Sequence, residues 1–294
     1  MNSTSTDKTE LKNIYRPMLM KIISIADETK DTRTLRLEFS DQKEKDAFNF
    51  KAGQFGLYSA FGHGEAVFCI SSSPSKKGYI ECTFKKVGKV TVALRNLDIG
   101  DTVGFRGPYG NNFPIDNLKG KNLLFIGGGI GLAPLRSLID NVLDLRSEFS
   151  NITILCGARS VSDFIYKGQI REWESRSDLK LVKTVDALTS PAEETEWKAS
   201  NGRVGLIPKI LADINPSANN TYAIVCGPPI MIKFTLQELE KLNFSRDKVI
   251  TTLENRMKCG FGKCGRCNIG PIYICKEGPV FTAEELKNLP QSDF

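Results

Sequence analysis

The sequence has few of the features that identify several common classes of protein. It contains a single histidine, His63, which lies in a Gly-His-Gly turn. Acid–base chemistry centred on histidine is therefore not expected, whereas hydride transfer to a cofactor does not need it. Long hydrophobic runs are also missing. The most apolar stretch, residues 123–135, is interrupted by glycines and is shorter than the roughly 20 residues of a membrane span.

A strong charge of one sign is absent as well. The formal net charge is +6 over 294 residues, which is too small for the dense basic surface of a nucleic-acid-binding protein. The first ten residues, MNSTSTDKTE, contain no apolar segment of the kind found in signal peptides. We therefore expect a cytoplasmic protein that binds no nucleic acid and has no membrane span. The length favours two domains or slightly more.

Residues 17–117 alternate apolar and polar positions in short runs that are separated by turn residues. Such runs predict strands. The predicted strands are 19–25, 32–39, 54–61, 67–72, 79–86 and 101–106. Short strands at this spacing favour a small antiparallel barrel of six strands.

Residues 118–250 instead alternate strands with helices. The predicted strands are 122–126, 151–156, 179–185 and 222–225, and the predicted helices are 132–149, 163–176 and one that begins at Pro229. This alternation predicts a parallel α/β sheet. Residues 251–294 form a short segment rich in glycine and cysteine, which ends in a small helix marked by the capping box Thr282-x-x-Glu285.

The eight cysteines fall into two groups. Four are scattered through strand-like runs, as expected of buried thiols: Cys69, Cys82, Cys156 and Cys226. The other four, Cys259, Cys264, Cys267 and Cys275, follow the pattern C-x4-C-x2-C-x7-C. The first three have the spacing of a plant-type 2Fe–2S loop, and the intervening glycines allow the sharp turns that such a loop needs. The alternatives are a structural zinc site, for which the long first gap is unusual, and a disulfide scaffold.

A glycine-rich loop lies between the first strand and the first helix of the α/β region. It consists of Gly127, Gly128, Gly129, Ile130, Gly131, Leu132, Ala133 and Pro134. Glycines let the backbone approach a pyrophosphate, and a helix N-terminus offers it N–H groups. A second loop, Cys226, Gly227, Pro228 and Pro229, follows a later strand. Together they predict one nucleotide-binding crevice at the carboxyl ends of the strands, and the alternative is two tight packing turns.

Two weaker motifs lie in the barrel region. Gly88, Lys89, Val90 and Thr91 precede a short helical stretch, 92–97, and form another candidate phosphate cradle. Phe68, Cys69, Ile70, Ser71 and Ser72 form a strand that ends in hydroxyl groups. Taken alone, each motif is better explained by an ordinary turn of the barrel.

In this order, these motifs and the turn 107–110 resemble the ferredoxin-NADP reductase superfamily, over residues 17–285. With the cysteine loop, the chain is similar to the FAD- and NAD-binding gamma subunits of cytoplasmic sulfhydrogenases. It also resembles the matching subunit of anaerobic sulfite reductases and the electron-transfer subunit of dihydroorotate dehydrogenase. The resemblance implies an FAD-binding barrel (17–117), an NAD(P)-binding α/β domain (118–250) and a segment that binds a 2Fe–2S cluster (251–294).

The resemblance also implies roles for individual residues. Phe68 to Ser72 would line the flavin, and Gly88, Val90 and Thr91 would hold its pyrophosphate. Gly127 to Pro134 and Cys226 to Pro229 would hold NAD(H) or NADP(H). Two positions depart from the family pattern. The usual arginine falls on Ala66, and the usual serine or threonine beside flavin N5 falls on Cys69, which is either a weak donor to N5 or an inert core thiol.

The choice between NADH and NADPH stays open. The second α/β strand ends in Cys156, Gly157, Ala158, Arg159 and Ser160, without the acidic residue that binds a ribose 2′-hydroxyl. Arg159 is a candidate ligand for a 2′-phosphate. The alternative is that it only pairs with Asp163.

These cofactors imply a diaphorase-type electron-transfer subunit. A nicotinamide would exchange a hydride with FAD, and FAD would pass electrons through the cluster to a catalytic redox subunit. Such a partner would be a hydrogenase, a sulfite reductase or a flavin-based bifurcating enzyme. A self-sufficient oxygenase reductase fits less well, because the C-terminal segment is too short for a separate ferredoxin domain. A nucleotide-sensing regulatory module with a zinc-binding tail is the alternative outside catalysis.

Overall fold

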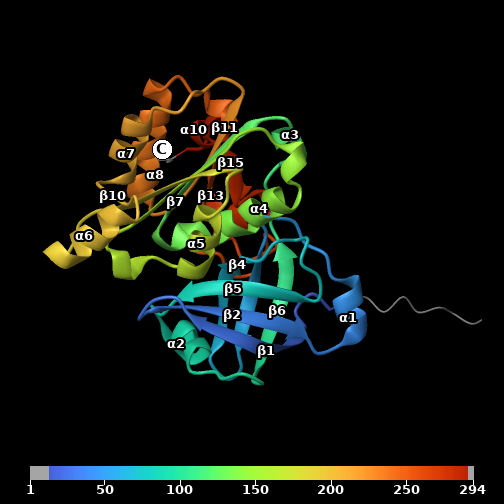
Figure 1. The fold of residues 1–294 in the computed structure, drawn as a ribbon. Helices are drawn as coiled ribbons and strands as arrows, with labels where there is room; N and C mark the ends of the chain where they lie inside the picture. The colour runs from blue at the N-terminus through green and yellow to red at the C-terminus, as the bar shows by residue number, and fades with distance from the viewer. Residues whose placement is uncertain (1–12, 291–294) are drawn as a thin grey trace, which may run out of the picture.

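The computed structural model describes residues 13–290. The first ten residues, in which we expect no signal peptide, lie outside the described residues. Two sheets dominate the molecule, one below the other in Figure 1. The lower sheet forms the barrel, and helices cover both faces of the upper sheet. Within residues 13–290, no helix is both long and apolar enough to cross a membrane.

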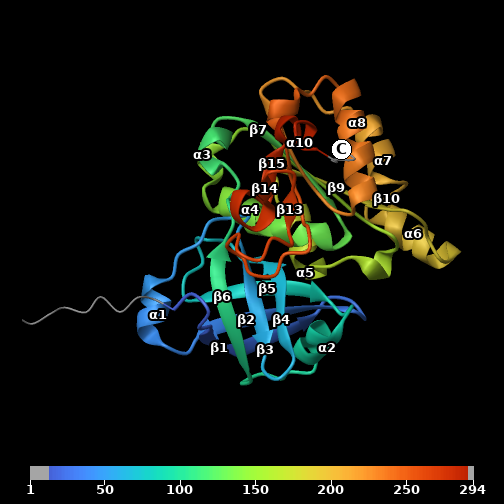
Figure 2. The same ribbon diagram turned by 180° about the vertical axis from the view of Figure 1, so that it is seen from behind.

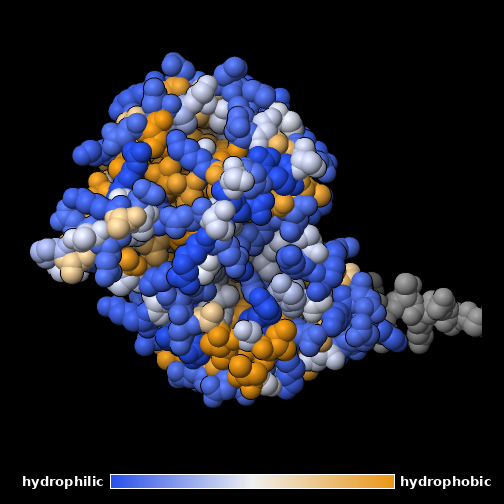
Figure 3. All heavy atoms as spheres, viewed as in Figure 1, coloured by the Kyte–Doolittle hydropathy of each residue, from blue (hydrophilic) through white to orange (hydrophobic). Residues whose placement is uncertain are grey.

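The lower sheet is antiparallel and nearly closed, as the alternation of apolar residues predicts. Its strands are β1 (Met18–Asp27), β2 (Thr32–Phe39), β3 (Phe55–Ala60), β4 (Gly64–Cys69), β5 (Tyr79–Lys85) and β6 (Thr102–Tyr109), in the order β4-β3-β6-β1-β2-β5. In β1, Met18, Met20 and Ile22 are buried in the barrel, whereas Leu19 and Ile23 face outward. Figure 3 shows exposed apolar residues on the outer face of the barrel. Helices α1 (Gln42–Ala47) and α2 (Lys89–Arg95) lie at its ends, and α3 (Ile115–Leu118) leads to the second sheet.

The upper sheet contains seven strands in the order β10-β9-β8-β7-β11-β12-β15. They are β7 (Asn122–Gly128), β8 (Ile152–Ala158), β9 (Lys180–Val185), β10 (Arg203–Val204), β11 (Thr221–Cys226), β12 (Val249–Thr252) and β15 (Val280–Thr282). All neighbours pair in parallel except β15, which is antiparallel to β12. Apolar residues of α4 (Leu132–Asp144), α5 (Lys167–Glu174) and α6 (Pro191–Ala199) pack on one face. Those of α7 (Ile207–Ile214) and α8 (Pro229–Lys241) pack on the other.

The predicted helices are present in the structure, but their ends differ from the predicted ends. The helix predicted over 132–149 ends at Asp144, because Leu145 leaves the helical conformation and a single 3₁₀ turn follows. The helix predicted over 163–176 begins only at Lys167, because Tyr166 adopts a left-handed backbone with φ of 56°. The short stretch predicted over 92–97 begins earlier, at Lys89. The sequence pattern also missed α6 and α7.

The C-terminal segment leaves the upper sheet after β12 and returns to it as β15. Between these strands lie the cysteine loop, the hairpin β13 (Asn268–Ile269) and β14 (Ile272–Tyr273), and α9 (Ile274–Glu277). Figure 2 shows this segment passing from the sheet toward the barrel, where Phe55 and Leu57 of β3 pack against it. The last helix, α10 (Ala283–Lys287), has the predicted capping box: Thr282 Oγ1 accepts from the Glu285 N–H at 3.1 Å, and Glu285 Oε2 accepts from the Thr282 N–H at 2.7 Å.

Candidate functional site

The segment Phe68–Ser72 lies between the barrel and the upper sheet. Phe68 stacks on Phe84 inside the barrel, with ring centroids 5.3 Å apart, whereas Cys69 packs against the core of the upper sheet. β4 is only partly covered along its length, although its neighbour β3 is fully buried. A half-covered strand in the wall of a barrel leaves room for a flat ligand, so the local shape fits the predicted flavin position.

The two predicted nucleotide loops meet at the carboxyl edge of the sheet. Gly127 of β7 pairs directly with Cys226 of β11. A Cβ on Gly131 would lie 2.5 Å from the Cys226 carbonyl oxygen and from the Gly227 backbone, so this glycine allows the loops to touch. Gly129 differs, because its φ is +54° and a Cβ there would meet no atom within 4 Å. The loops therefore combine a close packing contact with an open stretch of backbone that a ligand can approach.

Three segments that are distant in the sequence meet at Cys69. Burial raises the pKa of Cys69 well above its usual value, and the nearby Glu254 and Cys226 raise it further. Burial also raises the pKa of Cys226 to about 12, although Thr252 Oγ1 donates a hydrogen bond to its sulfur at 3.3 Å. The Glu254 side chain keeps an exposed part, and desolvation of the rest raises its pKa. Sequence reasoning missed Glu254; the available signal was a carboxylate two positions after Thr252, which ends β12.

The phosphate cradle predicted in the barrel is organised by its own threonine. Thr91 Oγ1 accepts from the backbone N–H groups of Val87 and Gly88 and donates to the Gly88 carbonyl, each at 2.9 Å. Gly88 faces open space, and Val90 lies beside β4 at Gly64. Because its hydroxyl is hydrogen-bonded within the turn, Thr91 stabilises the conformation of the predicted phosphate cradle. A ligand bound there would contact backbone N–H groups.

Three of the clustered cysteines, Cys259, Cys264 and Cys267, lie on one loop beside the barrel, and Cys275 lies in α9 after the hairpin. The glycines of this loop adopt the predicted sharp turns, with φ of +88° at Gly260, +78° at Gly262 and +71° at Gly265. A Cβ on Gly260 would lie 2.6 Å from the Tyr109 ring, so this glycine also allows close approach to β6. Cys267 and Cys275 are buried, Cys259 is half-buried and Cys264 is exposed.

Backbone N–H groups of this loop point at sulfur atoms. Gly262 donates to Cys275 Sγ at 3.1 Å, and Lys263 and Cys264 donate to Cys259 Sγ at 3.2 and 3.5 Å. Burial alone would raise the pKa of Cys259, but backbone hydrogen bonds outweigh it and lower the pKa to about 6. Among residues 13–290, no three His, Cys, Asp or Glu side chains are arranged for a single metal ion. Sulfurs served by backbone donors fit the ligand set of an iron–sulfur cluster.

Arg159 follows β8 at the same edge of the sheet and is largely exposed. Its Nε lies 3.4 Å from Asp163 Oδ2, and Ser160 Oγ donates to the same carboxylate atom at 3.1 Å. Arg159 also lies within electrostatic range of Asp186, which follows β9. The structure therefore contains the ion pair of Arg159 and Asp163, which was the alternative to a phosphate-binding role. The guanidinium of Arg159 is nevertheless exposed and accessible to a ligand.

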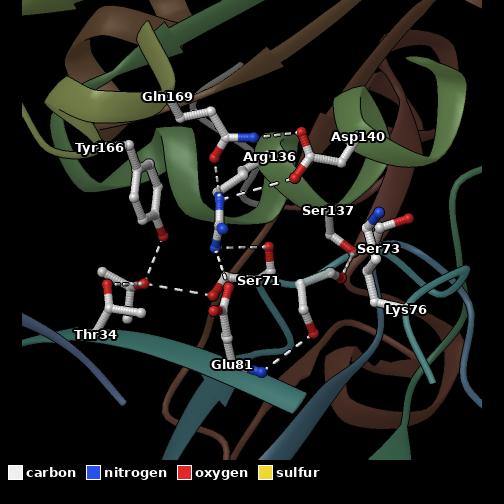
Figure 4. Close-up of polar contacts among 12 residues, drawn as sticks. Thr34, Ser71, Ser73, Lys76, Glu81, Arg136, Ser137, Asp140, Tyr166 and Gln169 are labelled. Carbon is white, nitrogen blue, oxygen red and sulfur yellow. Dashed lines mark hydrogen bonds and ion pairs between the residues drawn. The ribbon is translucent and has the colours of Figure 1, made fainter. Parts of the chain in front are cut away.

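A polar network that sequence reasoning missed joins the two halves of the molecule (Figure 4). Arg136 of α4 pairs with Glu81 of β5 at 2.5 Å, and both side chains are mostly buried. The Arg136 guanidinium also lies over the Tyr166 ring, 4.7 Å from its centroid. Ser137 Oγ donates to the Ser72 carbonyl at 2.7 Å. The helix after the glycine loop therefore holds the Phe68–Ser72 segment directly, and the only sequence signal was a charged residue in the first turns of an apolar helix.

Three families match consecutive parts of the chain. Residues 19–113 match the oxidoreductase FAD-binding domain, and residues 125–237 match the oxidoreductase NAD-binding domain. Residues 254–287 match the iron-sulfur cluster binding domain of dihydroorotate dehydrogenase B.

Relatives and solved structures agree with these matches. Sulfhydrogenase 1 subunit gamma of Pyrococcus furiosus is 36% identical over 282 residues, which cover 95% of this chain and 94% of that protein. A second relative is the probable electron transfer subunit of dihydroorotate dehydrogenase B (NAD(+)) of Thermococcus kodakarensis. It is 30% identical, and the matched region covers 94% of this chain and 100% of that protein. An NADH-dependent reduced ferredoxin-NADP oxidoreductase structure has the same fold, with a TM-score of 0.72 and 21% identity over 92% of this chain and 89% of that chain. This chain therefore belongs to the family of FAD- and NAD-binding oxidoreductase subunits with an iron–sulfur domain that includes the sulfhydrogenase gamma subunits and the electron transfer subunits of dihydroorotate dehydrogenase B.

Proposed function

We propose that this chain takes a hydride from NADH or NADPH and delivers the electrons, through FAD and a 2Fe–2S cluster, to a catalytic partner subunit. The observation that carries the proposal is the arrangement of Cys69, Cys226 and Glu254: Cys69 packs against the core that contains Cys226, and Thr252, two residues before Glu254, donates to the Cys226 sulfur at 3.3 Å. One comes from the FAD-binding region, one from the NAD-binding region, and one lies at the start of the iron–sulfur region. A site at the junction of these three regions would bring a nicotinamide, a flavin and a cluster close together.

The residues of the chain would bind and orient these groups. In the proposal, Phe68–Ser72 lines the flavin ring, and the turn at Gly88–Thr91 offers N–H groups to its pyrophosphate. The open backbone at Gly129 and the loop Cys226–Pro228 hold the nicotinamide cofactor. When bound, the flavin supplies the exchange between a two-electron hydride and single electrons. The protein contributes position, and its packed interior excludes water from the crevice.

The proposed cluster ligands are Cys259, Cys264, Cys267 and Cys275. Backbone N–H groups directed at sulfur stabilise negative charge and therefore favour a reduced cluster. The exposed Cys264 marks the edge of the loop that a partner can reach. Exposed cations surround this edge: Lys258, Lys263, Arg266 and Lys276. We propose that the partner docks here with an acidic surface, as electrostatic complementarity requires.

We also place the protein in the cytoplasm. None of the eight cysteines forms a disulfide in the structure, and cysteines without disulfides are usual in a reducing compartment.

An absorption spectrum of the purified full-length protein tests the proposal. Flavin bands together with broad iron–sulfur absorption are expected, and reduction with NADH or NADPH should bleach both. A rhombic electron-paramagnetic-resonance signal in the reduced protein would identify the 2Fe–2S type. A colourless protein that contains zinc would overturn the proposal in favour of the nucleotide-sensing module.

A further inference from the structure

A cavity of about 280 Å³ lies between α5 and α6, which are at the lower edge of the upper sheet in Figure 1. Its apolar lining consists of Phe164, Ile170 and Trp197, which are buried, and of Val161. The rings of Phe164 and Trp197 lie 5.5 Å apart. None of the residues that we propose for FAD, the nicotinamide or the cluster lines this cavity. Its volume falls just below the roughly 300–1,000 Å³ of sites for drug-sized molecules, so it suits a smaller ligand.

The two helices line the cavity with side chains at the same spacing, i, i+3, i+4 and i+7. On α5 these are Lys167, Ile170, Arg171 and Glu174. On α6 they are Glu193, Glu196, Trp197 and Ser200. Because this spacing puts side chains on one face of a helix, each helix directs one continuous stripe at the cavity. In both stripes an apolar side chain lies among charged or polar ones, so the cavity offers a ligand both kinds of contact.

A buried lysine lines the cavity from the side of the sheet. Lys183 of β9 is 8% exposed, although Leu181 and Val185, which alternate with it along the strand, pack in the apolar core. Its Nζ lies 2.7 Å from Glu174 Oε1 and 5.4 Å from the centroid of the Trp197 ring. A lysine is rarely buried without a partner. Its ammonium group has three hydrogens, so Lys183 keeps hydrogens for a ligand after it bonds to Glu174.

Only part of the charge around the cavity is paired within the protein. Glu193 Oε2 accepts from the Thr189 N–H and hydroxyl at 2.6 and 2.7 Å, and Lys167 Nζ donates to a main-chain carbonyl at 3.3 Å. Arg171 and Glu196 differ, because within residues 13–290 neither side chain has a hydrogen bond or an ion pair. A cation on α5 and an anion on α6 therefore line one cavity without pairing with each other.

We propose that this cavity binds a small zwitterion with a flat apolar body, the class to which aromatic α-amino acids belong. The Arg171 guanidinium donates two parallel hydrogen bonds to the ligand carboxylate, the geometry that arginine favours. Glu196 accepts from the ligand ammonium group, and the ring of the ligand lies against Trp197. A ligand with only one charge leaves either Arg171 or Glu196 without a partner. The inference goes beyond the proposed function, because the proposed electron transfer uses no group of this cavity.

Titration calorimetry of the purified full-length protein tests this inference with four probes. L-phenylalanine carries the ring and both charges, 3-phenylpropionate lacks the ammonium group, phenethylamine lacks the carboxylate, and glycine lacks the ring. L-phenylalanine should show saturable binding with a Kd of about 1 mM or tighter. Each of the other three should bind roughly ten- to a hundredfold more weakly, because each loses either a charge-assisted hydrogen bond or the burial of the ring.

Two variants that remove a charge separate the two ends of the ligand. Glu196→Gln should weaken the binding of L-phenylalanine by about tenfold or more and leave that of 3-phenylpropionate unchanged. Arg171→Gln should weaken the binding of both and leave that of phenethylamine unchanged. Glu194→Gln and Arg176→Gln are the matched controls, because these residues are ion-paired and do not line the cavity. All four side chains are exposed, so the variants should fold.

The two tryptophans of the chain locate the bound ligand. L-phenylalanine should change the emission of Trp197, so the response should survive in Trp173→Phe, which lies outside the cavity lining, and disappear in Trp197→Phe. The inference is overturned if L-phenylalanine does not bind, if 3-phenylpropionate binds equally well, or if Glu194→Gln lowers the affinity as much as Glu196→Gln. None of these results depends on flavin or cluster, so the absorption spectrum judges the proposed function separately.

Discussion

At Gly129 the backbone faces open space, because φ is +54° and no atom lies within 4 Å of a Cβ position. We predict that Gly129→Val weakens binding of NADH or NADPH and leaves FAD bound. The new side chain would occupy the space through which a pyrophosphate approaches. Stopped-flow reduction of the flavin at increasing nicotinamide concentration measures the affinity.

Gly120→Val is the matched control for this substitution. Gly120 also has a positive φ, +70°, and open space around it, but it precedes β7 at the opposite edge of the sheet. A valine at position 120 would therefore carry the same backbone strain as a valine at position 129, about 1–2 kcal/mol for a side chain in the left-handed region. Equal nicotinamide affinities for the two variants would show that Gly129 does not face the cofactor.

The clustered cysteines lead to a second prediction at the scale of residues. Changing any one of Cys259, Cys264, Cys267 or Cys275 to Ala should abolish the paramagnetic signal of the reduced cluster while sparing the flavin, because each would supply one ligand. Cys264→Ala is the most informative variant, since its exposed side chain contributes little packing. Cys156→Ala, in a buried strand away from the loop, should keep the signal. Survival of the signal in all four loop variants would disprove the ligand assignment.

Arg159 decides a question of specificity. We predict that Arg159→Ala lowers kcat/KM for NADPH by roughly ten- to a hundredfold and changes that for NADH little. A charge-assisted hydrogen bond to a 2′-phosphate is worth about 1.5–3 kcal/mol. Arg176→Ala, which breaks an ion pair with Asp178 away from the sheet edge, is the control. An equal loss for both cofactors, or no loss, would show that Arg159 serves only Asp163.

Among the elements, β15 depends on one side chain of the barrel. Asn111 Nδ2 donates to the Val280 carbonyl at 2.7 Å, and Asn111 Oδ1 accepts from the Val280 N–H at 2.9 Å. This asparagine therefore acts like one residue of a neighbouring strand and anchors the end of the cysteine segment. We predict that Asn111→Ala lowers the free energy of unfolding by about 1–3 kcal/mol, since it leaves both partners unsatisfied.

Chemical denaturation measures this loss, and limited proteolysis should show earlier cleavage in the cysteine segment. Asn112→Ala is the matched control, because the Asn112 side chain donates to the carbonyl of its neighbour Phe113 and to no other group within residues 13–290. If both variants lose the same stability, the anchoring role of Asn111 is wrong.

For the whole molecule, the contact between barrel and sheet depends on the ion pair of Arg136 and Glu81. Removing one member of a buried ion pair leaves the other charge without a partner, which typically lowers the free energy of unfolding by 3–5 kcal/mol. Glu81 retains Arg36 at 2.8 Å, so we predict a loss near the lower end, about 3 kcal/mol, for Arg136→Ala. The double variant Arg136→Met/Glu81→Leu should recover most of this loss, because neither member of the pair is left as a lone buried charge and Asp140 keeps its hydrogen bond from Gln169.

An exposed pair provides the comparison. Lys198→Ala removes the partner of Glu194 on the surface of α6 and should change stability by less than about 1 kcal/mol. Urea unfolding of all variants gives the free energies. A double variant that is no more stable than Arg136→Ala would show that packing of the arginine side chain, and not its charge, joins the two halves.

The sequence by itself determined the parts of this protein that depend on local chemistry. Alternating apolar residues predicted the barrel strands, because side chains of a strand point to opposite faces in turn. The capping box at Thr282 and the turning glycines of the cysteine loop were predictable for the same reason, since each acts within a few residues. Helix ends were less predictable, because Tyr166 takes a left-handed conformation that only its tertiary contacts explain.

Only the tertiary structure decided which distant polar groups meet. Glu254 is close enough to Cys69 to act on it electrostatically although 185 positions separate them in the numbering, and no periodicity encodes that proximity. The pair of Arg136 and Glu81 likewise joins a helix of the upper sheet to a strand of the barrel. A buried polar group must find a partner, but its own sequence neighbourhood does not say which one, because the partner is chosen by how the sheets pack.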